Sequence, residues 1–401
     1  MRKKSEPDRE SPLILKELVL PLYIPSLLKD LGLGMMLPVI PLYAHSLGAG
    51  IAVSGLIVAA RSIGAFFFDL PGGAIVSRYN KGTLLIVSMG LTALFGGAMG
   101  ITKGVWALFL LYLLYGCSHS LLLLSRLSYL KASVRRNLRG RTMAGFGGVL
   151  RAGRFIGPIL GGLVGKFLNL PAVFFAQALI TFLAFSIMIV FLKPEKGVLK
   201  PDPDISIPKQ FLEVAKEHRM TFLTAGTVMF LLQLIRTGRE IIIPLWGTEV
   251  GLDVANVGFI LGIASAVDVV LFYPVGTLMD NLGRKWAAVP CLILLSLGYT
   301  LIPLAGSFYG LLLISLLMGL GNGLGAGINM TLSSDLAPRK GHGEFFGLWQ
   351  MITDTGGSAG PYLIGTIAQG LALSLAPLAV AGLGLVGAVI MIFFVKETLH
   401  K

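Results

Sequence analysis

Twelve long apolar runs follow one another along this sequence. Each is about as long as the roughly 20 residues that an α-helix needs to cross a hydrocarbon layer of about 30 Å. Because the runs are uniformly apolar, without the alternation of a membrane barrel, they favour helices. We therefore expect an all-α polytopic membrane protein with spans at 18–44, 52–77, 82–102, 105–130, 142–166, 171–193, 220–247, 256–279, 286–305, 309–334, 344–369 and 374–395.

The charge distribution predicts how the chain is oriented in the membrane. The net charge is +13, which alone would also fit a nucleic-acid-binding protein. With the N-terminus in the cytoplasm, 24 of the 33 Lys and Arg residues fall in cytoplasmic segments and two, Lys103 and Lys166, in external loops. This is the positive-inside pattern, so the charge indicates topology and no nucleic-acid partner. We expect an integral protein of the plasma (inner) membrane with both termini in the cytoplasm.

The second half of the chain repeats the first at a shift of 203 residues. Three prolines fall on prolines and eight glycines on glycines without a gap. Two parallel repeats of six spans predict a binding site between the halves, near the middle of the bilayer. We expect an N-terminal six-helix bundle at 1–193, a cytoplasmic linker at 194–219 and a C-terminal six-helix bundle at 220–401.

Two loops carry a motif that resembles one of the major facilitator superfamily. The loop after span 8 reads GTLMDNLGRK and fits the family pattern G-x-x-x-D-x-x-G-R-K. The matching residues are Gly276, Asp280, Gly283, Arg284 and Lys285. The loop after span 2, GAIVSRYNKG, keeps Gly73 and Arg78 but has Ser77 in place of the acid. The resemblance implies that these loops gate the cytoplasmic side.

Span 5 contains GRFIGPILGG, which resembles the proton-antiporter signature of the family's drug exporters. The matching residues are Gly153, Gly157, Pro158, Gly161 and Gly162. Small residues at this spacing let helix backbones approach closely. The resemblance implies twelve helices in two parallel repeats and transport by alternating access. It also implies that span 5 packs against its counterpart in the other half.

Charged residues interrupt only spans 1, 2, 4, 5, 7, 8 and 11. A charge at the centre of a membrane helix costs about 2.5–3.5 kcal/mol on insertion scales, so it should face a cavity or a partner. In the family, spans 3, 6, 9 and 12 face lipid, which agrees with their lack of charge. The candidates for substrate binding or proton coupling are Asp30, Arg151, Arg154, Arg236, Arg239, Glu240, Asp268 and Asp354.

Several pairings among these residues can be predicted from spacing. Arg151 and Asp354 occupy equivalent positions of the two repeats, so they are candidates for an ion pair across the halves. Arg151 and Arg154 share one face of span 5, and they either form such structural pairs or bind substrate. Arg236 and Glu240 lie one turn apart and can satisfy each other, which would leave Arg239 free.

Asp30 and Asp268 are the leading candidates for the proton carrier, because a carboxyl group buried in a membrane span can take up a proton near neutral pH. We expect a secondary active transporter that exports small amphipathic compounds in exchange for protons. The alternative is a transporter of organic anions or metabolites, by symport or uniport, that uses the buried arginines. Seven positive against five negative charges within the spans favour this alternative.

No enzymatic activity is expected. The sequence has no segment large enough for a soluble catalytic domain and no G-x-x-x-x-G-K-[ST] loop for nucleotide phosphates. It also lacks His and Cys at metal-ligand spacing. We therefore expect no cofactor and no metal. The expected partners are a small-molecule substrate, protons and the lipid bilayer, and the protein is expected to be monomeric.

Overall fold

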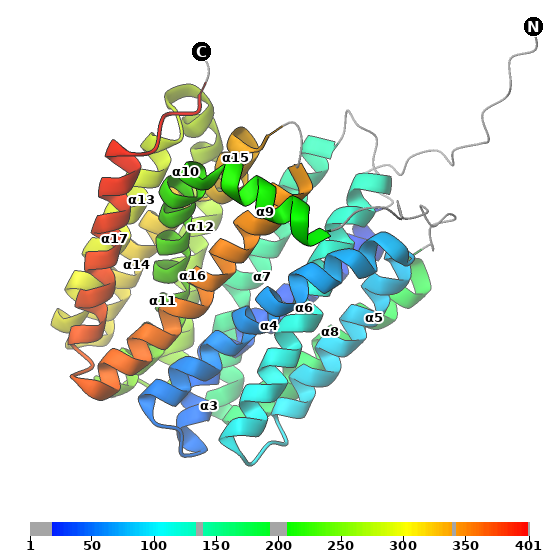
Figure 1. Ribbon diagram of the computed structural model, residues 1–401. Helices are drawn as coiled ribbons and strands as arrows, with labels where there is room; N and C mark the ends of the chain where they lie inside the picture. Colours follow the sequence, from blue (N-terminus) through cyan, green and yellow to red (C-terminus); the bar gives the residue numbers. More distant parts are fainter. Residues whose placement is uncertain (1–17, 134–138, 193–206, 339–341, 400–401) are drawn as a thin grey trace, which may run out of the picture.

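The computed structural model describes residues 18–133, 139–192, 207–338 and 342–399, and these form helices joined by short connections. Figure 1 shows the helices of the first half beside those of the second. The elements of the first half are η1 (Val19–Tyr23), α2 (Ile24–Met36), α3 (Ile40–Ser46), α4 (Ile51–Arg78), α5 (Lys81–Met99), α6 (Val105–Ser133), α7 (Arg139–Phe167) and α8 (Leu170–Phe191).

The second half begins after α9 (Ile207–Glu217), a helix inside the predicted linker. Its elements are α10 (Arg219–Thr221), η2 (Phe222–Gly226), α11 (Thr227–Glu249), α12 (Val254–Leu282), α13 (Lys285–Leu301), η3 (Ile302–Leu304), α14 (Phe308–Leu324), α15 (Ile328–Leu336), α16 (His342–Gly370) and α17 (Leu375–Phe393). The predicted limit at 193 falls on a residue outside the described ones, and the division into domains stays a prediction.

The predicted all-α membrane architecture is confirmed. Ten helical segments among the described residues are long and apolar enough to cross a membrane. The two other predicted spans are α7 and α16, which carry more polar and charged residues. Both pack inside the bundle, α7 between α2 and α12 and α16 between α4 and α11, so their polar residues have protein neighbours.

Two of the spans are broken. Span 1 is divided between α2 and α3 by a turn that contains Pro38, whose ring prevents a continuous helix. Span 10 is divided between α14 and α15 at Gly325–Gly327, where Gly327 has a φ of 82°. This left-handed conformation favours glycine, and the break leaves backbone carbonyls without helical partners.

The glycines of GRFIGPILGG bring α7 into backbone contact with α2. A Cβ at Gly157 would lie 2.5 Å from the carbonyl oxygen of Leu31, and one at Gly161 would lie 2.1 Å from that of Met35. The second half repeats this packing between α16 and α11, where a Cβ at Gly360 would lie 2.1 Å from the carbonyl oxygen of Leu234. The sequence repeat is therefore also a repeat of helix packing.

Between the halves, α7 packs on α12 and α16 packs on α4. A Cβ at Gly162 would lie 2.7 Å from the carbonyl oxygen of Val254, and one at Gly365 would lie 2.9 Å from that of Ile51. The prediction that span 5 packs against its counterpart, span 11, is therefore wrong. The small residues of each of these helices face a glycine-containing helix start in the other half, where backbones can approach most closely.

The bundle has two ends, which we name by position. The termini end carries α9 and the chain after α17, and the far end carries the connections α3–α4, α7–α8, α11–α12 and α16–α17 (Figure 1). The close contacts at Gly162 and Gly365 lie at the far end. Nearer the termini end, a Cβ at Gly73 or Gly276 would meet no atom within 4 Å. The two halves thus meet tightly at the far end, with free space beside α4 and α12 at the other.

Candidate functional site

A cavity of about 160 Å³ lies between the two halves. Side chains from predicted spans 1, 2, 4, 5, 7 and 11 line it, so both repeats contribute. Its charged or titratable lining residues are Arg61, Asp69, His119, Arg154, Glu240 and Asp354. Three acids and two arginines thus line the cavity, although cations outnumber acids in the spans as a whole. The cationic excess lies outside the cavity lining, at residues such as Lys29 and Arg126.

The first half surrounds Asp30 with cations. The Asp30 carboxylate lies 3.8 Å from Lys29 Nζ, 3.8 Å from Arg126 Nη1 and 3.5 Å from Arg154 Nε. The Asp30 side chain is 2% exposed, whereas Arg154 is 52% exposed and reaches the cavity. A buried carboxylate needs such compensation, and a neutral Asp30 would leave three cations without it. The role of Asp30 as proton carrier stays a prediction.

Packing explains why Arg154 reaches Asp30. Gly153 precedes it, and a Cβ at Gly153 would lie 3.0 Å from the carbonyl carbon of Asp30. Only a glycine permits α7 to approach α2 this closely. On the other side, Lys29 Nζ donates to Nδ1 of His119 at 2.6 Å, which ties α2 to α6.

In the second half, two pairings predicted along α11 are wrong. Arg236 does not pair with Glu240; its Nη2 donates to the carbonyl oxygen of Gly325 at 2.8 Å, in the break between α14 and α15. Arg239 is not free, because its Nη2 lies 3.7 Å from Asp268 Oδ2. The break in span 10 supplies carbonyl acceptors that compete with a carboxylate one turn away.

Two of these side chains have further partners that the spacing did not predict. Asp268 Oδ2 also accepts a hydrogen bond from Asn322 Nδ2 at 2.6 Å. Glu240 instead accepts a hydrogen bond from Arg61 Nη2 at 3.3 Å. That bond joins α11 to α4 and thus links the two halves inside the cavity.

The predicted ion pair between Arg151 and Asp354 is also wrong. Arg151 Nη1 donates to the carbonyl oxygen of Gly147, and its guanidinium interacts electrostatically with Asp268. Gln350 Nε2 donates to both carboxylate oxygens of Asp354, each at 3.1 Å. The two positions are equivalent in sequence, but α7 faces α12 and α16 faces α4, so they lie at different contacts between the halves.

Sequence reasoning missed the neighbour of Asp354, which is Asp69 on α4. Both carboxyl groups line the cavity, and they interact electrostatically with each other. The Ser120 hydroxyl donates to Asp69 Oδ1, whereas Asp69 Oδ2 is buried and has no donor in the described part of the chain. The repeat carried no signal for this contact, which the structure shows at Gly55 and Gly365: α4 and α16 lie antiparallel there, so later residues of α4 lie near earlier residues of α16.

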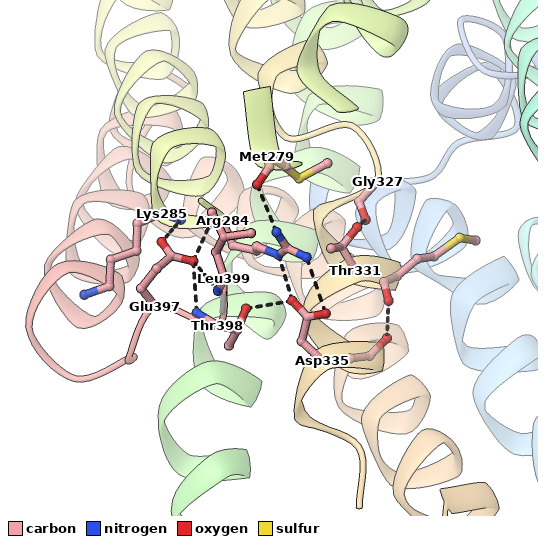
Figure 2. A network of polar contacts seen from close by, with 11 residues as sticks. Met279, Arg284, Lys285, Gly327, Thr331, Asp335, Glu397, Thr398 and Leu399 are labelled. Atoms are coloured by element: carbon pink, nitrogen blue, oxygen red, sulfur yellow. Dashed lines mark hydrogen bonds and ion pairs between the residues drawn. The ribbon is translucent and has the colours of Figure 1, made fainter. Parts of the chain in front are cut away.

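At the termini end, the GTLMDNLGRK motif is held by the C-terminal segment (Figure 2). Arg284 Nε donates to Asp335 Oδ2 at 2.7 Å, while the Glu397 carboxylate accepts from the backbone N–H groups of Arg284 and Lys285 at 2.8 and 3.1 Å. Burial raises the pKa of Glu397, but these N–H groups together with those of Thr398 and Leu399 lower it by more, so the pKa lies below its ordinary value. The motif is thereby fixed to α15 and to the end of the chain.

The remaining motif residues contribute differently. Gly283 has a φ of 112°, a backbone conformation that favours glycine, and a Cβ there would lie 2.5 Å from the Glu397 carboxylate and displace it. Asp280 and Arg78 are exposed. The side chain of Ser77 lies outside the described part of the chain.

At the far end, each half reaches the start of a helix in the other. Lys166 Nζ lies 2.7 Å from Asp253 Oδ2 before α12, and Gln369 Oε1 accepts the N–H of Ala52 on α4 at 2.9 Å. Lys166 and Gln369 are equivalent positions of the repeat. The hydrogen bond from Lys166 lowers the pKa of Asp253, and the N–H of Asn256 lowers it further. We call these two contacts the far-end latch.

Comparison with known proteins places this geometry in a family. The sequence model of the major facilitator superfamily matches residues 22–238 and again 225–401. The multi-drug resistance efflux pump PmrA of Streptococcus pneumoniae is 25% identical over 344 residues, which cover 82% of this chain and 84% of that protein. The multidrug resistance protein MdtG of Salmonella choleraesuis is 24% identical over 342 residues, which cover 82% and 83%.

Solved structures share the fold. A POT family transporter in complex with a thioalcohol-conjugated peptide has a TM-score of 0.81 at 12% identity, covering 95% of each chain. A bacterial homologue of the human lysosomal transporter Spinster has a TM-score of 0.78 at 12% identity, covering 95% of this chain and 97% of the other. At this identity the likeness concerns the arrangement of helices and not the substrate.

Proposed function

Because this chain belongs to the major facilitator superfamily, we propose that it exports small amphipathic compounds in exchange for protons, by alternating access. The observation that carries the proposal is the cavity between the repeats, lined by charged residues from both halves and closed at the far end. PmrA, named as a multi-drug resistance efflux pump, supports the direction and the substrate class, and MdtG, named as a multidrug resistance protein, supports the substrate class.

The orientation follows from the charge distribution along the sequence. The positive-inside rule assigns the termini end to the cytoplasm. The described conformation is then inward-facing, with the far-end latch closing the external side. A substrate would enter the cavity from the cytoplasm and leave after the halves rock about it.

The glycines at the contacts between the halves suit such a movement. Gly162 and Gly365 hold the halves together at the far end, while Gly73 and Gly276 have unfilled space towards the termini end. Closing the cytoplasmic side would fill that space as the far-end contacts separate. We expect the two halves to switch between two discrete arrangements, because packed interfaces are bistable and do not deform continuously.

The test uses the purified protein in liposomes that carry a pH gradient. Tetraphenylphosphonium and ethidium serve as cationic substrates, and protein-free liposomes serve as the control. We expect transport that follows the gradient and is abolished when a protonophore dissipates it. Transport at an equal rate without the gradient would contradict proton coupling, and transport of neither compound would contradict export of amphipathic cations.

A second candidate function is the transport of organic anions. It is favoured by Arg154, whose half-exposed side chain reaches the cavity from a cluster of three cations around Asp30. If this function holds, organic anions should raise the melting temperature of the detergent-purified protein, and Arg154→Ala should abolish the effect. Ligand at 100 times its Kd stabilises the folded state by about 2.7 kcal/mol, which such a measurement resolves. Stabilisation by cations alone would exclude it.

A further inference from the structure

Two carboxyl groups from opposite halves meet in the cavity. Asp69 belongs to α4 and Asp354 to α16, the helices that also meet at the far end through Gly55 and Gly365. The two side chains line the same cavity and interact electrostatically with each other. They thus join the halves at a position that any rocking movement must open or reshape.

The hydrogen bonds around this pair lack one donor. Ser120 donates to Asp69 Oδ1, and Gln350 donates to both oxygens of Asp354. Asp69 Oδ2 is buried, with no donor among the described residues. An ionised carboxylate is only an acceptor, whereas a protonated one also donates an O–H. A single proton shared by the pair supplies the missing donor and removes the repulsion between two adjacent negative charges.

The charged groups around the pair leave that repulsion largely uncompensated. Arg61 on α4 is the cation that acts on Asp354, but it is bonded to Glu240 of α11. Arg154 on α7 is paired with Asp30. His119 on α6 faces the cavity and accepts from Lys29. With these pairs set aside, Asp69 and Asp354 are the acids of the cavity that lack a cation of their own.

We propose that Asp69 and Asp354 form the proton-binding site of the transport cycle, and that a monovalent organic cation displaces the proton from the same two carboxylates. The proposal rests on the proposed proton-coupled export and assigns its coupling site. The exchange balances: one O–H bond breaks, one proton leaves to the water in the cavity, and one cation takes its place. The two carboxyl groups and their ligand together carry one net negative charge both before and after the exchange of proton for cation.

This arrangement gives a physical reason for obligatory exchange. With neither proton nor cation, two negative charges face each other between α4 and α16 and oppose closure of the halves around the cavity. With either ligand, the repulsion is relieved and the halves can close. A ligand shifts a conformational equilibrium only if its affinity differs between the two conformations. Here the affinity differs because the proton or the cation relieves the repulsion between the two carboxylates when the halves close.

The first test measures the proton directly, without substrate. Infrared difference spectroscopy of the purified full-length protein, titrated with alkali, should show the carbonyl band of a protonated carboxylic acid disappearing. The same component should be missing from Asp69→Asn and from Asp354→Asn. Asparagine has the shape of a protonated carboxyl group and still donates an N–H, so these variants should fold. Glu344→Gln, near the start of α16, is the matched control and should keep the band.

The second test measures competition. The Kd of the wild-type protein for tetraphenylphosphonium should fall by about tenfold for each unit of rising pH below the midpoint of the band's titration and level off above it, because one proton is released per cation bound while the pair is protonated. In Asp354→Asn this pH dependence should be lost. A band that survives in both asparagine variants, or binding whose pH dependence is unchanged in them, overturns the proposal.

The outcomes separate this site from the proposed function. If the band belongs to the pair but no cation is transported along a pH gradient, the export function is wrong and the proton site stands, but its coupling role is overturned. If transport is driven by the gradient and both asparagine variants retain that coupling, the export function stands and the assignment of Asp69 and Asp354 is wrong.

Discussion

A methyl group at Gly162 should open the far end of the protein. In the described conformation, the new Cβ would lie 2.7 Å from the carbonyl oxygen of Val254, 3.0 Å from Cα of Ala255 and 3.2 Å from Cα of Gly258. All three are backbone atoms of α12, so no side chain can rotate away. Helices α7 and α12 must therefore separate, which weakens the contact that holds the halves together.

The size of the effect follows from the cost of overpacking. Forcing an extra methyl group into a packed contact costs about 1–3 kcal/mol. In the proposed alternating-access cycle, the outward-facing conformation separates these helices and does not incur this cost. Since each 1.4 kcal/mol is a factor of about ten, Gly162→Ala should favour that conformation by roughly 5- to 150-fold.

Pulsed electron paramagnetic resonance can measure this shift. Spin labels at Leu168 and Leu371, both exposed at the far end, report the separation of the halves once Cys117 and Cys291 have been replaced. Gly162→Ala should add a population at longer distance. The control is Gly382→Ala on α17, an exposed position away from the contacts between the halves, where a Cβ meets no atom within 4 Å and the distances should not change. Equal distance distributions in Gly162→Ala, Gly382→Ala and the parent protein would refute the reasoning.

Three further predictions concern the polar contacts. Arg236→Ala should lower the free energy of unfolding by about 1.5–3 kcal/mol, measured by thermal melting, because it removes the hydrogen bond from a charged donor to the Gly325 carbonyl in the break of span 10, which keeps the N–H of Ile328. Glu397→Gln should lower the melting temperature at neutral pH but not in acid. The pKa of Glu397 is lower in the folded state, so its carboxylate stabilises the fold at pH values above the unfolded-state pKa. This stabilisation is lost as the pH falls through the folded-state pKa. Asp253→Asn should weaken the far-end latch by less than about 1 kcal/mol, seen as a small gain in the long spin-label distance, because Lys166–Asp253 is an exposed pair. Acidifying the parent protein through the lowered pKa of Asp253 should have the same effect as this variant, because protonation removes the charge of the carboxylate that Lys166 contacts. In Asp253→Asn, the same acidification should have no further effect.

The local sequence determined the spans, the repeat and the packing surfaces. The apolar runs predict membrane helices because each polar residue that is placed in the bilayer adds its own free-energy cost. The glycines at 153, 157 and 161 lie on one face by helical spacing alone, and they do meet a neighbouring helix. These inferences need no knowledge of which helix lies beside which.

The partners of the charged side chains were decided by the tertiary structure. Arg236 and Glu240 are close enough along α11 to pair, yet the break in span 10 offers Arg236 a carbonyl, and Arg61 of the other half binds Glu240. Spacing along one helix limits which contacts are possible, but the competing donors and acceptors come from helices brought together by packing. Asp69 and Asp354 lie 285 positions apart in the sequence, and only the antiparallel contact of α4 with α16 makes them neighbours.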